Sequence, residues 1–146
     1  MQSPITQLEE LTITSASKRF LKETAKWAFF LSIIGFILIF LMLIFAIFAN
    51  TIFGMAAQMQ PGMPDNIGMI MTVTYLVLAV VYFFPVYYLM QFANKMKKAI
   101  ATKNDETLAK SFEMLKSHYK FLGVFTIITI SLYVLLIIFS AIGGLV

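Results

Sequence analysis

Three methionines recur every four residues in the connection between two hydrophobic runs, at Met55, Met59 and Met63. Their thioether sulfurs are soft ligands, and a methionine cluster is one way to hold Cu(I). Neither histidine nor an acidic residue accompanies the three in ligand spacing. Methionine is also an adaptable apolar side chain for irregular interfaces. We therefore expect packing rather than a metal site in this connection, with copper binding as the alternative.

The only histidine, His118, has no second histidine, nucleophile or carboxylate cluster placed to work with it. A general base needs such partners, so we expect His118 to be a residue of the membrane interface. The sequence contains no cysteine, which excludes disulfides, thiolate catalysis and cysteine-based metal sites. It also lacks a phosphate-binding glycine loop, a catalytic elbow and a zinc-binding pattern. The sequence therefore predicts neither an enzyme nor a cofactor.

Basic side chains are confined to two polar segments. Four lie in residues 18–26 and seven in residues 93–120, which accounts for all eleven Lys and Arg residues, and residues 50–67 carry none. Because basic segments beside membrane spans stay in the cytoplasm, we expect an internal N-terminus and an external C-terminus. The same rule explains the net charge of +4, so nucleic-acid binding is not predicted. Anionic lipid headgroups on the cytoplasmic side are the expected contact.

Three hydrophobic runs must position these side chains. The chain is 60% hydrophobic and 12% charged, with a mean hydropathy of +0.88, which is the composition of a membrane protein. The runs at residues 27–49, 68–92 and 121–145 contain no Asp, Glu, Lys, Arg or His. Each is as long as the roughly 20 apolar residues that cross a bilayer. We predict an all-α protein with a mobile tail at residues 1–14 and one domain of three transmembrane helices at residues 15–146.

The polar segment at residues 93–120 has helical periodicity on both sides of a break at residues 103–105. Apolar residues alternately four and three positions apart are typical of a coiled-coil-like seam. We predict that the second and third helices continue past the membrane as a cytoplasmic hairpin, whose seam contains Met96, Ile100, Leu108, Phe112 and Leu115. Its outer side is expected to form a docking surface of Lys97, Lys98, Lys110 and Lys116.

Small and hydroxylated residues follow the same spacing into the hydrophobic runs. Such residues line helix contacts in membranes, because they permit close backbone approach or hydrogen bonds between helices. A spacing near 3.5 residues favours left-handed crossing. We predict a left-handed three-helix bundle with contacts at Ala28, Ser32, Gly35, Tyr75, Tyr82, Thr126, Thr129 and Tyr133. Pro85 interrupts the second run, so a kink is expected there, with a hinge as its functional interpretation.

Four segments together carry a resemblance to a known family. They are YFFPVYYL at residues 82–89, FANKMKKAI at 92–100, Asn104-Asp105, and LKSHYK at 115–120. In these segments the chain resembles a family of small bacterial inner-membrane proteins classed as a domain of unknown function. The resemblance covers mainly residues 25–138. It implies a bacterial multi-span membrane protein and brings no catalytic or binding residues.

The expected function follows from a docking hairpin on a chain without site chemistry. We expect a small accessory subunit of a bacterial inner-membrane assembly, whose hairpin binds a membrane-protein partner or anionic lipid. The alternative is a homo-oligomeric channel or small-solute transporter built around the hydroxyl-bearing helix faces. Ion-coupled transport is disfavoured, because the spans lack ionisable groups and the chain lacks repeated halves.

Overall fold

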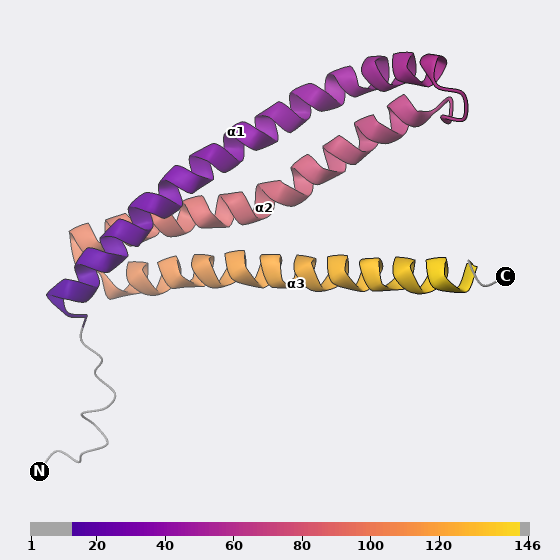
Figure 1. Ribbon diagram of the computed structural model, residues 1–146. Helices are drawn as coiled ribbons and strands as arrows, with labels where there is room; N and C mark the ends of the chain where they lie inside the picture. Colours follow the sequence, from indigo (N-terminus) through magenta and orange to yellow (C-terminus); the bar gives the residue numbers. More distant parts are fainter. Residues whose placement is uncertain (1–12, 144–146) are drawn as a thin grey trace, which may run out of the picture.

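The computed structural model describes residues 13–143, which form three long α-helices joined by two short connections (Figure 1). Helix α1 is Ser15–Met59, α2 is Ile67–Thr102 and α3 is Asp105–Gly143. No β-strand occurs within this range. The predicted all-α class is confirmed. The tail predicted at residues 1–14 lies almost wholly outside the described residues.

All three helices are long and apolar enough to cross a membrane. They contain 45, 36 and 39 residues in chain order. At a rise of about 1.5 Å per residue, even the shortest extends for about 54 Å, whereas the hydrocarbon core of a bilayer is about 30 Å thick. The length and composition of the helices indicate a multi-pass membrane protein. Each helix is longer than a single crossing of the hydrocarbon core requires.

Local side chains set the helix ends. Thr14 caps α1, since its hydroxyl accepts a hydrogen bond of 3.1 Å from the backbone N–H of Ser17. Helix α2 stops where Lys103 adopts a left-handed conformation with φ of 51°. Asn104 then begins α3, because its side-chain oxygen accepts a bond of 2.7 Å from the N–H of Thr107. The chain therefore reverses direction at the predicted break.

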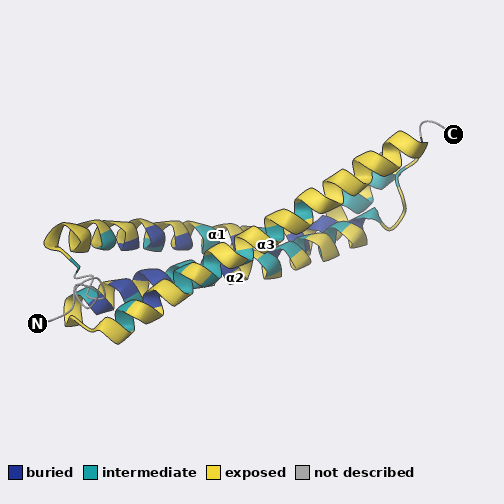
Figure 2. Ribbon diagram, turned by 90° about the horizontal axis from the view of Figure 1, so that it is seen from below, coloured by how far each residue is buried: buried dark blue, intermediate teal, exposed yellow. Residues whose placement is uncertain are grey.

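Helices α1 and α2 pack against each other through small side chains. A single stripe of α1 is buried, at i, i+3 and i+4 spacing: Ala25, Ala28, Ser32, Ile39, Ala46 and Ala49. Ser32 satisfies its hydroxyl by donating to the carbonyl of Phe29 on its own helix at 2.7 Å. In Figure 2 the buried positions follow α1 and α2 and are sparse on α3. Small residues let the two backbones come close, which is how helices gain contact in an apolar solvent.

Two glycines mark the closest approaches between α1 and α2. A Cβ at Gly35 would lie 2.7 Å from a methyl group of Val86. A Cβ at Gly68 would lie 2.6 Å from the backbone carbonyl oxygen of Asn50. A valine side chain can turn aside, whereas a backbone oxygen cannot move without shifting its helix. Gly68 is therefore the position that least tolerates a side chain.

Helix α2 is the central element of the fold. Its backbone approaches those of both α1 and α3 closely, whereas the backbones of α1 and α3 do not come close to each other within residues 13–143. Figure 1 shows α2 bending in its middle, so that one half follows α1 and the other half also runs beside α3. Pro85 lies in the middle of α2 and is buried. Its ring removes a backbone donor and crowds the preceding turn, which favours such a bend.

The second half of α3 leaves the other two helices (Figure 1). Every residue from 130 to 143 is exposed within the described chain. The predicted helix contacts at Thr126 and Tyr133 are therefore wrong in this structure, where Tyr133 is 63% exposed. Thr129 is half-buried, but its hydroxyl donates to the carbonyl of Phe125 on the same helix at 2.8 Å. The prediction extended the 3.5-residue spacing along the whole of α3, although α2 turns away from α3 before these positions.

The close approach at Gly68 generates a first prediction. Gly68→Ala should lower the free energy of unfolding by about 1–3 kcal/mol, because the new methyl group meets backbone that cannot give way. Thermal unfolding in a mild detergent measures the change. Gly54→Ala is the matched control, since no atom lies within 4 Å of a Cβ at that position. Equal stability of the two variants would contradict the close approach of α1 and α2.

Candidate functional site

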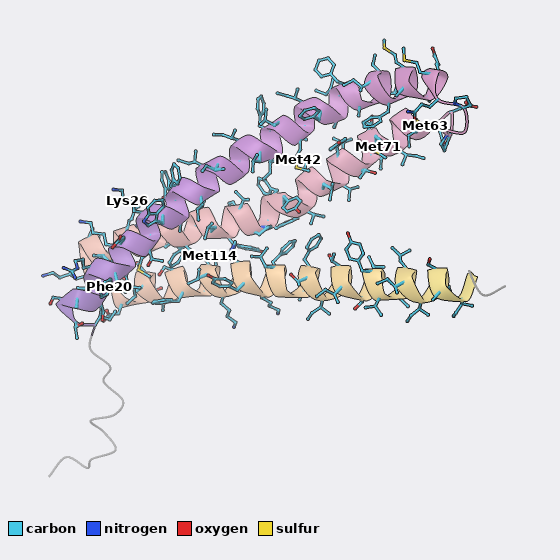
Figure 3. The ribbon with its side chains drawn as sticks, in the orientation of Figure 1. Phe20, Lys26, Met42, Met63, Met71 and Met114 are labelled. Carbon is cyan, nitrogen blue, oxygen red and sulfur yellow. The ribbon has the colours of Figure 1, made fainter. Side chains whose placement is uncertain are left out.

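The eleven basic residues gather at one end of the molecule. Ten of them belong to the beginning of α1, the end of α2 and the beginning of α3, which lie together in Figure 1, and Lys103 lies in the connection between α2 and α3. We call this region the basic end and define it as residues 15–30 and 92–120. The opposite end contains the connection between α1 and α2. In Figure 3, Phe20 and Lys26 mark the basic end and Met63 marks the opposite one.

The main hydrophobic cluster of the fold lies within the basic end. Its buried members are Ala25 and Ala28 of α1 and Phe92, Ala93 and Met96 of α2. Half-buried apolar side chains of all three helices pack against them: Leu21, Phe29, Leu89, Ile100, Leu108, Met114 and Leu115. Four of the five predicted seam residues, Met96, Ile100, Leu108 and Leu115, therefore lie in or against this cluster. The α2–α3 hairpin is not a free projection, since α1 packs on its other side.

The fifth predicted seam residue, Phe112, is misplaced by one position. Phe112 is 43% exposed, whereas its neighbour Ser111 is completely buried. The Ser111 hydroxyl donates to the carbonyl of Leu108 at 2.6 Å and lies 3.9 Å from the sulfur of Met96. A small residue at this point leaves room for the Met96 side chain of α2. Counting apolar residues favoured Phe112 because hydrophobicity, and not size, guided the count.

The predicted docking lysines have different surroundings. The Lys97 amino group lies 4.0 Å from the centre of the Phe29 ring on α1, a cation–π contact that links α2 to α1. Lys110 is 2.6 Å from the carboxylate of Glu106, one helical turn earlier. Lys98 and Lys116 are exposed. The four lysines therefore differ in the groups that they contact.

The Glu106–Lys110 pair shifts both protonation equilibria. The hydrogen bond from Lys110, followed by its charge, lowers the pKa of Glu106. The same hydrogen bond and the Glu106 charge raise the pKa of Lys110. Both side chains are exposed, and solvent screening makes such pairs weak contributors to stability.

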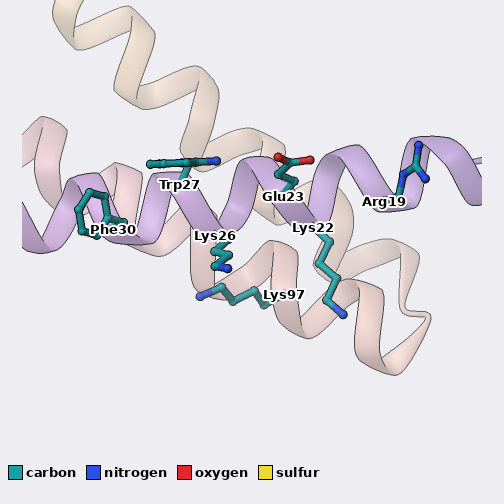
Figure 4. Close-up of a pocket in the computed structure, with 7 residues that line it drawn as sticks. All are labelled: Arg19, Lys22, Glu23, Lys26, Trp27, Phe30 and Lys97. Atoms are coloured by element: carbon teal, nitrogen blue, oxygen red, sulfur yellow. The ribbon is translucent and has the colours of Figure 1, made fainter.

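An open pocket of about 850 Å³ lies on the outer face of α1 at the basic end. Helix α1 lines it with Arg19, Lys22, Glu23, Lys26, Trp27 and Phe30, and α2 contributes Lys97 (Figure 4). The sequence indicated that Lys22 and Lys26 face lipid headgroups. It did not indicate that Lys97 joins them, because that neighbourhood depends on the register between α1 and α2. The register between two helices cannot be predicted from the local sequence of either one.

Of a row of contacts between α2 and α3, only that of Tyr82 was predicted from the sequence. His118 lies 2.8 Å through its Nδ1 from the carbonyl oxygen of Pro85. Since a carbonyl only accepts, Nδ1 carries the hydrogen. The Phe84 and Phe121 rings stack with their centres 6.0 Å apart, and Tyr82 approaches Phe125 at 6.3 Å. Tyr82 thus contacts α3 while 44% exposed. His118 is a helix-packing residue near the bend of α2.

The remaining predicted residues lie toward the opposite end. Tyr75 is half-buried and stacks on Phe45 of α1, with ring centres 6.3 Å apart. Met55 and Met59 are 59% and 81% exposed near the end of α1, and Met63 is half-buried in the connection that follows. Within residues 13–143 no three His, Cys, Asp or Glu side chains are grouped to hold a metal ion. Packing by the three methionines stays the prediction, with copper binding as its alternative.

Comparison with known proteins gives one match. The model of a family of unknown function, DUF5362, matches residues 65–141, more than half of the chain. The chain belongs to this family. No curated protein and no solved structure matches it significantly. The resemblance inferred from the sequence is confirmed at the level of a family without a known function.

The DUF5362 match begins just before α2 and ends just before the end of α3. It contains the α2 and α3 parts of the hydrophobic cluster, the bend at Pro85 and the His118 contact. Helix α1, with most of the pocket-lining residues, precedes it. The family segment is therefore the helical hairpin, against which α1 packs in this chain.

The one-residue correction of the seam can be tested with two adjacent substitutions. Ser111→Asp should abolish the packing of α3 on α2, because it places an unpaired charge against Met96 in a fully buried position. Phe112→Asp should be tolerated, since its side chain reaches solvent. Limited proteolysis of the hairpin in detergent measures both. The reverse order of sensitivity would restore Phe112 to the seam.

Proposed function

We propose that the protein is a small accessory subunit of a bacterial inner-membrane assembly, with its basic end at the cytoplasmic surface. The observation that carries the proposal is the gathering of all eleven cations at the end where the three helices are packed together. A packed and charged end on an otherwise apolar molecule is suited to binding at a membrane surface.

The orientation follows from the charge distribution. Segments rich in Lys and Arg beside membrane spans stay in the cytoplasm, which gives an internal N-terminus and an external C-terminus. The connection between α1 and α2 then lies outside. A left-handed crossing of α1 and α2 within the bilayer belongs to this proposal, as the stripe of small residues near 3.5-residue spacing favours it.

The docking surface that we propose from the structure differs from the lysine surface predicted from the sequence. Phe112, Lys116 and Tyr119 are spaced at i, i+4 and i+7, so they share one face of α3. Phe112 is 43% exposed and Tyr119 is 65% exposed. Exposed aromatic residues beside a lysine are typical of protein-binding surfaces, where aromatics are enriched. We call these three residues the α3 docking face and assign it to a membrane-protein partner.

A variant that keeps the fold tests this assignment. A tagged full-length chain is extracted from its native membranes in mild detergent, and its partners are quantified by mass spectrometry. We expect a defined partner with wild-type protein and with Lys103→Gln, and its loss with Phe112→Asp. Wild-type protein that runs alone as a monomer would contradict the accessory role, and a partner retained by Phe112→Asp would contradict the docking face.

The exposed apolar half of α3 favours a second candidate function. Residues 130–143 are all exposed within the described chain, and Tyr133 and Ser140 provide hydroxyl groups there. A homo-oligomeric channel or small-solute transporter would use this half of α3 to join several copies. Purified protein that stays monomeric in a lipid bilayer and gives no solute flux in liposomes would remove this candidate.

A further inference from the structure

One face of α1 changes from basic to aromatic within three turns. Arg19, Lys22 and Lys26 recur at spacings of three and four residues, and Phe30 continues the row. Trp27 lines the same pocket from the other edge of α1, as Figure 4 shows. At about 1.5 Å per residue, Lys22 and Phe30 are separated by about 12 Å along the helix axis. The cations therefore lie toward the end of the helix and the aromatic rings toward its hydrophobic run.

The pocket on this face has an excess of positive charge. Four cations line it, including Lys97 of α2, against one carboxylate, Glu23. Within residues 13–143, none of the four lies within 4.0 Å of a carboxylate oxygen. Figure 4 shows the Lys26 and Lys97 side chains extending into the same region between α1 and α2. A ligand with negative charge would relieve the repulsion among these cations.

The position of Lys97 is fixed from both sides. Its helix is held by Ala93 and Met96, which are completely buried in the cluster with α1. Its amino group lies over the Phe29 ring at 4.0 Å. Lys26 sits between Ala25 and Ala28, which pack in the same cluster. The two lysines are therefore presented by packed helices, unlike lysines on a solvated face.

The aromatic part of the pocket is exposed although it is apolar. Trp27 is 59% exposed and Phe30 is 51% exposed, and their rings meet edge to face with centres 6.0 Å apart. Trp side chains are enriched where hydrocarbon meets headgroups, because one part of the ring is apolar and the other donates a hydrogen bond. The ligand of this pocket thus needs an anionic group joined to an apolar chain.

We propose that the pocket is a binding site for an anionic phospholipid. Its phosphate lies among Lys22, Lys26 and Lys97, and its acyl chains run along Trp27 and Phe30. Basic pockets between membrane helices bind such headgroups. Inorganic phosphate shares the anionic chemistry but would leave the two aromatic rings uncovered. The site rests on the proposed placement of the basic end at the membrane surface and does not depend on a protein partner.

Trp27 is the only tryptophan of the chain, so its fluorescence reports on this pocket alone. The full-length protein is reconstituted into vesicles containing either phosphatidylglycerol or phosphatidylcholine with brominated acyl chains, at equal mole fraction. Bromine quenches tryptophan on contact. We expect stronger quenching by the brominated anionic lipid, and a preference that falls as salt rises.

Matched double variants separate this site from general surface charge. Lys26→Gln with Lys97→Gln should reduce the preference for phosphatidylglycerol about fivefold for each lysine removed. Lys103→Gln with Lys120→Gln removes the same charge from exposed positions outside the pocket and should leave the preference within about twofold. Equal losses in the two double variants, or equal quenching by the two lipids with wild-type protein, would overturn the site.

Two further arms complete the test. Inorganic phosphate at millimolar concentration should not reduce quenching by the brominated lipid; displacement by phosphate would overturn the lipid assignment in favour of a soluble anion. The measurement uses purified protein, so its result is independent of whether a partner is found in native membranes. Failure of the accessory role and failure of the lipid site are therefore distinguishable.

Discussion

The structure depends on the packing of Phe92 and Met96 between α1 and α3. These two side chains of α2 are almost completely buried, Ala25 and Ala28 cover them from α1, and Leu108 and Leu115 pack against them from α3. Small residues on α1 permit the approach from one side, and the buried Ser111 of α3 lies beside the Met96 sulfur on the other. Since this cluster lies among the lysines, the basic part of the chain also contains the main hydrophobic cluster of the fold.

Separation of α3 from α1 and α2 follows from this arrangement. Beyond the cluster, α2 bends in its middle, where Pro85 removes a backbone donor, and its first half follows α1. His118 and Phe121 hold α3 near the bend, and beyond Thr129 the helix is exposed within the described chain. The apolar half of α3 is therefore left for lipid or another protein, while the basic end keeps a defined shape.

Sequence periodicity predicted the helices and the break near Lys103, because hydrophobic runs and the capping residue Asn104 are local signals. It could not predict the exposure of Thr126 and Tyr133, since that depends on where α2 turns away from α3. The sequence assigned Phe112 to the seam, whereas the structure buries Ser111. The physical reason is the space that the Met96 side chain needs, which a count of hydrophobic residues does not take into account. That Lys97 lines the same pocket as Lys22 and Lys26 could not be predicted either, because it follows from the register between α1 and α2.

The central claim is that the three helices are joined at the basic end and that α3 is separate at the other. Double electron–electron resonance in lipid nanodiscs tests it with two pairs of spin labels on exposed residues of α1 and α3. The pair at Thr24 and Lys110 should give a short distance with a narrow distribution, and the pair at Ile47 and Ile137 a clearly longer one. A short and narrow distance for the second pair would contradict the account, because it would mean that all three helices pack together along their whole length.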